Sequence, residues 1–198
     1  MNPQTSTRRM ANPERRQAIL DTAGPMFAAR GYFATRLGDV AEAMGVTKPV
    51  VYRHFDSKRE LYLAILRRHE DDLPAFTQDL DPSRVTNLDQ LAELLDGWLD
   101  YVAVHPYAWQ ILFRDRTADE GIETVRGEVS DRAREVLVPL VAASAAPRAE
   151  VESTAEFLRS GLVGLVLWWI DHPRTSKAMI HATATRLVAQ ILRQEKGE

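Results

Sequence analysis

Residues 45–61 read GVTKPVVYRHFDSKREL, and this stretch decides the fold. It places Val46, Val51, Phe55 and Leu61 beside basic and hydroxyl side chains, within about four or five helical turns. A helix in a protein core would not carry so many polar groups, and a fully solvated helix would not carry these apolar ones. The stretch therefore predicts a helix with a protein scaffold on one side and a polar partner on the other.

The residues before this stretch complete a helical hairpin. Thr35 is expected to cap a short helix, Gly45 to supply a turn, and Thr47 to cap a second helix that runs to about His54. The apolar residues of the first of these helices have i, i+3, i+4, i+7 spacing: Leu37, Val40, Ala41 and Met44. Two short helices joined by a glycine turn are the pattern of a helix-turn-helix, whose second helix enters the major groove of DNA.

The polar residues of the hairpin are left on its outer side and suit a DNA duplex. Arg53 can contact guanine through two hydrogen bonds, and Val50 and Pro49 can contact a thymine methyl group. Lys58 lies in the first turn of the next helix, where free backbone N–H groups favour a phosphate. The residues predicted to contact DNA are Thr35, Arg36, Thr47, Lys48, Pro49, Val50, Tyr52, Arg53, His54 and Lys58.

Three blocks of sequence carry a family resemblance: GYFAT (31–35), DVAEAMGVTKPVVYRHF (39–55) and SKREL (57–61). Through them residues 14–61 resemble, almost position for position, the DNA-binding domain of the TetR family of transcriptional regulators. Two positions depart from the family pattern. Pro25 stands inside the first helix, where it is expected to kink the helix or tighten its last turns, and Arg36 stands where a small hydroxyl residue is common.

Composition excludes several other classes of protein. The chain has 198 residues, of which 45% are hydrophobic and 27% charged, which is typical of a soluble globular protein with one or two domains. It has no cysteine, so a disulfide scaffold, a thiolate nucleophile and a cysteine-ligated zinc are excluded. The N-terminus lacks the apolar segment of a secretory signal, and the longest apolar run, 161–170, is too short to span a bilayer. A cytoplasmic location is expected.

Charge is distributed unevenly along the chain. Residues 1–70 carry 12 Lys and Arg against 7 Asp and Glu, whereas residues 71–198 carry 13 against 21. A basic first third indicates that this end meets an anion. Arg8 and Arg9 can form an arm that reaches a minor groove, or they can belong to a disordered leader, and the sequence leaves both open.

Helical spacing recurs along the whole chain, which predicts an all-α fold of about nine helices. The expected helices cover approximately residues 12–31, 35–44, 47–54, 57–74, 87–105, 107–114, 119–142, 149–171 and 175–194. Residues 1–58 are predicted to form a helix-turn-helix DNA-binding domain. The family resemblance implies that 59–198 form a helical ligand-binding and dimerisation domain.

Large aromatic side chains gather in the second part of the chain. Leu94, Trp98 and Tyr101 share one face of the helix expected at 88–104. A single aromatic residue is more often part of a core, but together these rings can wall an apolar cavity, and the resemblance implies a ligand pocket here. The residues predicted to contact a ligand are Leu94, Trp98, Tyr101, His105, Trp109, Phe113, Phe157 and Trp168. An aromatic or long-chain apolar effector is expected.

Two glycines interrupt the apolar helix at 149–171. Gly161 and Gly164 each cost about 1 kcal/mol relative to alanine in a helix, so the close approach of another helix is expected to offset them. In the TetR family this helix and the last one form a four-helix bundle with their symmetry mates, so the resemblance implies a homodimer. The predicted interface residues are Gly161, Gly164, Leu165 and Trp169.

No catalytic or cofactor-binding pattern is present. The five histidines, His54 and His69 among them, form no metal-ligand pair and are expected to be surface or capping residues. The glycines form neither a phosphate loop nor a dinucleotide fingerprint. The chain is therefore interpreted as a dimeric regulator without cofactor, a repressor that an apolar ligand releases from a pseudo-palindromic operator. The alternative is a helical enzyme or structural module with an incidental helix-turn-helix hairpin.

Overall fold

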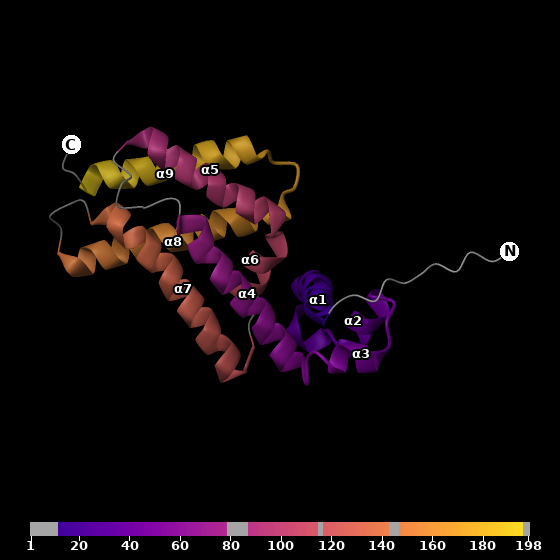
Figure 1. The fold of residues 1–198 in the computed structure, drawn as a ribbon. Coiled ribbons are helices and arrows are strands. Elements are labelled where there is room, and N and C mark those ends of the chain that lie inside the picture. Colours follow the sequence, from indigo (N-terminus) through magenta and orange to yellow (C-terminus); the bar gives the residue numbers. More distant parts are fainter. Residues whose placement is uncertain (1–11, 79–86, 115–116, 143–146, 196–198) are drawn as a thin grey trace. The chain divides into compact units, whose positions relative to one another are not determined.

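The structure, a computed structural model, describes residues 12–78, 87–114, 117–142 and 147–195, of which 70–78 and 194–195 are described by their backbone alone. Nine α-helices account for the regular structure of these residues, and no strand occurs among them, so the all-α prediction is confirmed (Figure 1). Within these ranges no helix is both long and apolar enough to cross a membrane. Arg8, Arg9 and most of the segment between the expected helices at 57–74 and 87–105 lie outside the described residues.

The chain divides into two compact units, residues 1–65 and 66–198. The division falls within α4 (Lys58–Gln78), later than the domain boundary predicted after residue 58. The reason is that the first turns of α4 pack in the N-terminal unit. The Tyr62 ring is fully buried there and meets the rings of Phe27 and Tyr32 edge-on, at centroid distances of 4.9 and 5.0 Å.

The first helix, α1 (Asn12–Ala34), supplies the centre of the N-terminal unit. Ile19, Ala23 and Phe27 are buried, and their i, i+4, i+8 spacing places them on one face of the helix. The helix continues through the exposed Pro25, and its backbone leaves helical geometry at Gly31, where φ is 79°. Glycine adopts this left-handed conformation at little cost, so the chain can turn there.

Thr35 does not cap the second helix, and that prediction is wrong. α2 (Leu37–Ala43) has Arg36 at its N-cap position, and the Arg36 backbone N–H donates to the Asp39 carboxylate at 3.3 Å. The Thr35 side chain is completely buried, and its hydroxyl donates to the backbone carbonyl of Gly31 at 3.0 Å. The Thr35 hydroxyl therefore supplies a donor to a carbonyl near the end of α1, where helix carbonyls have no backbone partner.

The hairpin itself forms as predicted. Gly45 makes the turn between α2 and α3 (Lys48–Tyr52) with φ at 63°, and Thr47 occupies the N-cap position of α3, although its side chain makes no capping hydrogen bond. Ser57 caps the start of α4, because its hydroxyl accepts a hydrogen bond from the Glu60 N–H at 3.1 Å. Val51 of α3 and Phe55 behind it are completely buried.

The second unit is a bundle of α5 (Leu88–Val104), α6 (Pro106–Phe113), α7 (Glu120–Val141), α8 (Arg148–Asp171) and α9 (Lys177–Glu195) together with the later part of α4. α5 packs along α9, and α7 packs along α8 (Figure 1). The α5–α9 pair is also joined by charges, because the Lys177 ammonium lies 2.8 Å from the Asp96 carboxylate and 2.6 Å from that of Asp100.

Candidate nucleic-acid interface and aromatic cluster

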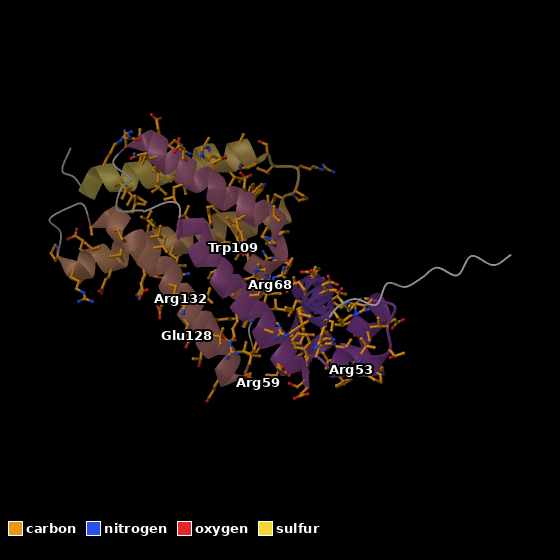
Figure 2. All side chains as sticks on the ribbon, viewed as in Figure 1. Arg53, Arg59, Arg68, Trp109, Glu128 and Arg132 are labelled. Atoms are coloured by element: carbon orange, nitrogen blue, oxygen red, sulfur yellow. The ribbon has the colours of Figure 1, made fainter. Side chains whose placement is uncertain are left out.

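The face of α3 opposite its buried residues is polar and open to solvent. Val51 and Phe55 fix the helix to the unit, so the residues between and before them point outward. Arg53, labelled in Figure 2, extends from the end of this helix. Of the residues predicted to contact DNA, the exposed ones are Arg36, Thr47, Lys48, Pro49, Tyr52 and Arg53, and the partly buried ones are Val50, His54 and Lys58.

Positive charge gathers beside this face. The pKa of His54 is lowered by partial burial and, after that, by the positive charges of Arg53, Arg15 and Arg16. The Arg16 guanidinium lies over the Phe55 ring, 4.7 Å from its centroid, so α1 and the end of α3 present their arginines close together. Such a grouping raises the local potential and attracts polyanions.

Two of the predicted DNA-contacting residues occupy other roles. Thr35 is 0% exposed, so its side chain cannot reach a phosphate. Lys58 donates from its ammonium to the carbonyls of Tyr32 and Phe33 at 2.8 and 3.1 Å, and the same nitrogen lies 4.5 Å from the centroid of the Tyr32 ring. Lys58 therefore supplies hydrogen-bond donors to carbonyls at the end of α1, which helical geometry leaves without partners.

In the second unit the structure brings four of the predicted ligand-contacting residues together. They are Trp98, Tyr101, Trp109 and Phe113, the aromatic cluster, and all belong to or pack against one buried core of α5, α6, α8 and α9. The Trp109 ring meets that of Trp98 edge-on at 5.6 Å and stacks on that of Phe113 at 5.3 Å. Leu94 is buried on α5, and the His105 ring lies 4.9 Å from that of Tyr101.

The side chains of α8 divide differently from the prediction. Phe157 and Trp168, predicted to contact a ligand, are 66% and 44% exposed. Together with the two glycines they form one exposed stripe of the helix, with Phe157 at i, Gly161 at i+4, Gly164 at i+7 and Trp168 at i+11. A Cβ built on either glycine meets no described atom within 4 Å. Leu165 and Trp169, predicted for the dimer interface, instead pack against the core that contains Trp109.

His69 is buried, contrary to the prediction that the histidines are surface or capping residues. His69 is not a surface residue, because only 1% of it is exposed, and its Nδ1 lies 3.2 Å from the Tyr101 hydroxyl. Its ring also lies 5.8 Å from that of His105 and 5.2 Å from that of Tyr107. The signal was present, because Leu61, Ile65 and His69 have i, i+4, i+8 spacing on α4. No group of three or more potential metal ligands occurs in the part of the chain that the structure describes.

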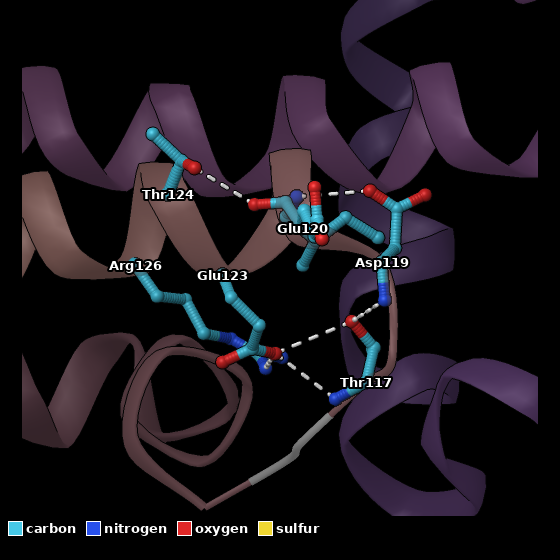
Figure 3. A network of polar contacts seen from close by, with 7 residues as sticks. Thr117, Asp119, Glu120, Glu123, Thr124 and Arg126 are labelled. Atoms are coloured by element: carbon cyan, nitrogen blue, oxygen red, sulfur yellow. Dashed lines mark hydrogen bonds and ion pairs between the residues drawn. The ribbon is translucent and has the colours of Figure 1, made fainter.

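A buried arginine was missed as well. Arg126 is 5% exposed and lies on the apolar stripe of α7, a spacing visible in Ile122, Val125, Arg126 and Val129. Figure 3 shows its partner, the Glu123 carboxylate, which accepts hydrogen bonds from Arg126 at 2.6 Å and from the Thr117 N–H at 2.9 Å. This network ties the segment before α7 to the helix. A buried charge of this kind needs such pairing to be tolerated.

The anchored, outward-facing second helix of the hairpin defines a helix-turn-helix DNA-binding protein. Residues 19–65 match the model of the tetR family of bacterial regulatory proteins. The N-terminal unit therefore carries the DNA-binding region of the TetR family of transcriptional regulators.

Two curated transcriptional regulators are similar to this chain in sequence. The transcriptional activator FasR of Mycolicibacterium smegmatis is 34% identical over 107 residues, which are 54% of this chain and 49% of FasR, so the match spans about half of that relative. The transcriptional repressor KstR2 of the same organism is 28% identical over 93% of both chains.

The solved structures share the fold. A tetR-family regulator from Streptomyces coelicolor has a TM-score of 0.74 at 23% identity, covering 95% of this chain and 84% of that one. AibR, solved in complex with isovaleryl coenzyme A and operator DNA, has a TM-score of 0.67 at 19% identity, covering 87% and 97%. These relatives are regulators rather than enzymes.

The position of Lys58 generates a prediction. Replacing Lys58 with Met should lower the free energy of unfolding by about 1–3 kcal/mol, because two charge-assisted hydrogen bonds to the end of α1 are lost. The salt dependence of DNA binding should stay unchanged, since the ammonium already serves carbonyl groups. Urea denaturation and binding measured at several salt concentrations check both parts. If the slope of log K against log salt decreased in magnitude by about one, Lys58 would be a phosphate contact after all.

Proposed function

We propose that this chain is a homodimeric, ligand-responsive repressor. The observation that carries the DNA-binding part is the exposed polar face of α3, set on the completely buried Val51 and Phe55. We infer repression, and not activation, because the repressor KstR2 aligns over 93% of this chain, whereas the match to the activator FasR covers 54%. Repression follows if the bound dimer blocks a promoter and a small molecule releases it.

The exposed residues of the hairpin suit two kinds of DNA contact, with bases and with phosphates. Arg53 has the fork geometry that reads guanine, and its exposed position leaves it available. Arg36 and Tyr52 are exposed at the two ends of the hairpin and suit phosphates. In a symmetric dimer two copies of α3 would enter successive major grooves on one side of the duplex. The operator is therefore a pseudo-palindrome with half-sites about one helical turn (~34 Å) apart or slightly more.

Selection of genomic fragments by the purified protein tests this function. Wild-type protein should recover a pseudo-palindrome, and Arg53→Ala should weaken binding to it by about 1–3 kcal/mol and relax base choice at one position of each half-site. Footprinting and competition with mutated half-sites measure both effects. Recovery of random fragments only, or conversion of a substrate by the protein, would favour the enzyme or structural module with an incidental hairpin.

The exposed stripe of α8 supports the dimer. Phe157 and Trp168 flank Gly161 and Gly164, and the neighbouring α9 adds two exposed apolar residues, Met179 at 48% and Leu187 at 45%. Exposed apolar residues gathered on two adjacent helices are typical of a protein interface. Glycines without a close neighbour within their own chain leave room for the backbone of another helix. We therefore assign this face, α8 with α9, to the partner copy, with Phe157 and Trp168 in place of Leu165 and Trp169.

Replacing Gly161 with Glu should dissociate the dimer, because it would place a charge where two helices approach closely. Sedimentation velocity should show a dimer for the wild type at micromolar concentration and a folded monomer for the variant. Gly127→Glu is the matched control, since Gly127 is also an exposed helical glycine without a described neighbour within 4 Å, but lies on α7. A monomeric wild type, or a variant that sediments as the wild type does, would contradict the assignment.

The aromatic cluster supports an effector that is mainly apolar. Trp109 is 3% exposed, and its indole N–H has no hydrogen-bond partner among the described residues. A buried donor left without an acceptor costs about 1–3 kcal/mol, which a ligand can recover by supplying one. An acyl or aromatic carbonyl on an apolar body combines the two properties. The fold of AibR holds an acyl coenzyme A, which is consistent with this ligand class.

Contacts of the cluster with α4 supply a route for the response. The Tyr101 ring belongs to the aromatic cluster, and its hydroxyl meets His69, a residue of α4. α4 also contributes Leu61 and Tyr62 to the DNA-binding unit. A ligand that displaces the Tyr101 ring would therefore act on the helix shared by both units. By linkage, the effector must weaken operator affinity by the factor by which the operator weakens effector binding.

Trp109→Phe should separate the two properties of the effector. It should weaken carbonyl-containing apolar compounds by about tenfold more than hydrocarbons of equal size, because both classes lose part of the ring surface but only the carbonyl compounds lose the N–H donor. Calorimetric titration of fatty acids, aromatic ketones and matched hydrocarbons, with and without operator, measures this. Equal loss for both classes would mean that Trp109 acts through packing alone, and binding without loss of operator affinity would contradict release.

A further inference from the structure

Gly38 stands in the first turn of α2, where a helix would gain stability from almost any other residue. Its φ is not positive, so no backbone conformation requires glycine here. What does require it is a side chain from the next helix. A Cβ built on Gly38 would lie 2.9 Å from Cε of Lys48, 3.4 Å from its Nζ and 3.7 Å from its Cδ.

The Lys48 side chain therefore runs back across α2. Lys48 is the first residue of α3, and its stem lies in the space that a larger residue at position 38 would fill. α2 and α3 pack against each other, which keeps the two positions close. The outer end of the side chain, Cε and Nζ, consequently lies beside the first turn of α2, at Gly38.

The charge of Lys48 is not used within the described residues. Lys48 is exposed, and its ammonium makes no hydrogen bond or ion pair with another residue in the described ranges. The acid next to Gly38 is already engaged, because the Asp39 carboxylate accepts from the Arg36 N–H at 3.3 Å and lies 3.8 Å from the Arg30 guanidinium. An ammonium held in this place is available for an external anion.

We propose that Gly38 is a positioning residue that lets Lys48 contact the phosphate backbone from above α2, so that Lys48 supplies affinity and not base choice. In a helix-turn-helix the first helix crosses the backbone while the second lies in the major groove. A lysine that folds over the first helix meets phosphates, which carry no sequence information. The inference rests on the proposed DNA binding by α3 and assigns a new role to Gly38 within it.

Gly38→Ala tests this inference because stability and DNA binding should change in opposite directions. Alanine favours the helix, and the atoms it would displace belong to the far end of a flexible side chain, so the midpoint of thermal unfolding should rise. Operator affinity should fall by about tenfold, because one charge-assisted contact is displaced. Gly38→Leu, which fills the path of the stem more fully, should lower affinity at least as much.

The comparison with Lys48→Ala shows whether Gly38 acts through Lys48. Each single variant should weaken operator and non-specific DNA by the same factor and lower the slope of log K against log salt by about one. In the Lys48→Ala background, Gly38→Ala should have no further effect on affinity or slope. Gly127→Ala, a glycine-to-alanine change on α7 without a described neighbour within 4 Å, should leave DNA binding unchanged.

Three results would overturn the inference. Wild-type affinity in both Gly38 variants would show that Lys48 does not depend on the space at position 38. A loss that persists in the Lys48→Ala background would make Gly38 a structural residue of α2. A change of base preference in Lys48→Ala would make Lys48 a base contact. In each case the wild type still binds its operator, whereas absence of any operator would overturn the proposed function itself.

Discussion

Complete burial of Val51 and Phe55 is the constraint on which the DNA-binding unit depends. α3 has five residues, and a helix of that length has almost no stability of its own in water. Its existence and its direction therefore come from packing. Once these two side chains are fixed, the intervening residues have no freedom to choose a face, and Arg53 and Tyr52 must project into solvent.

The end of α1 is the second point at which this unit is held. Gly31 turns the chain, and the carbonyl groups that the turn leaves free are satisfied by Thr35 and Lys58. Both side chains come from later in the sequence, and both had been expected at the DNA surface. Thr35 and Lys58 thus show that polar residues beside a recognition helix can stabilise the fold instead of binding DNA. A buried carbonyl without a donor costs free energy comparable to a lost hydrogen bond.

In the second unit, a single helix serves two purposes. The inner side of α8 packs Leu165 and Trp169 against the core that contains Trp109, and its outer stripe presents Phe157, the two glycines and Trp168. Two buried polar residues of this unit have specific partners, because Arg126 is paired with Glu123 and His69 lies against the Tyr101 hydroxyl.

The sequence by itself determined the all-α fold, the helix-turn-helix at 35–55 and the gathering of aromatic residues in the second unit. These follow from local spacing, glycine turns and caps, which depend on residues a few positions apart. Tertiary structure decided which face of α8 is buried and where the hydroxyl group of Thr35 points. Residues 161–170 of α8 are all apolar or glycine, so the periodicity of this segment could not select one buried face. The partners of Lys58 lie 25 and 26 positions away in the sequence, beyond the reach of local patterns. The path of Lys48 across Gly38 belongs to the same group, because it exists only when α2 and α3 are packed together.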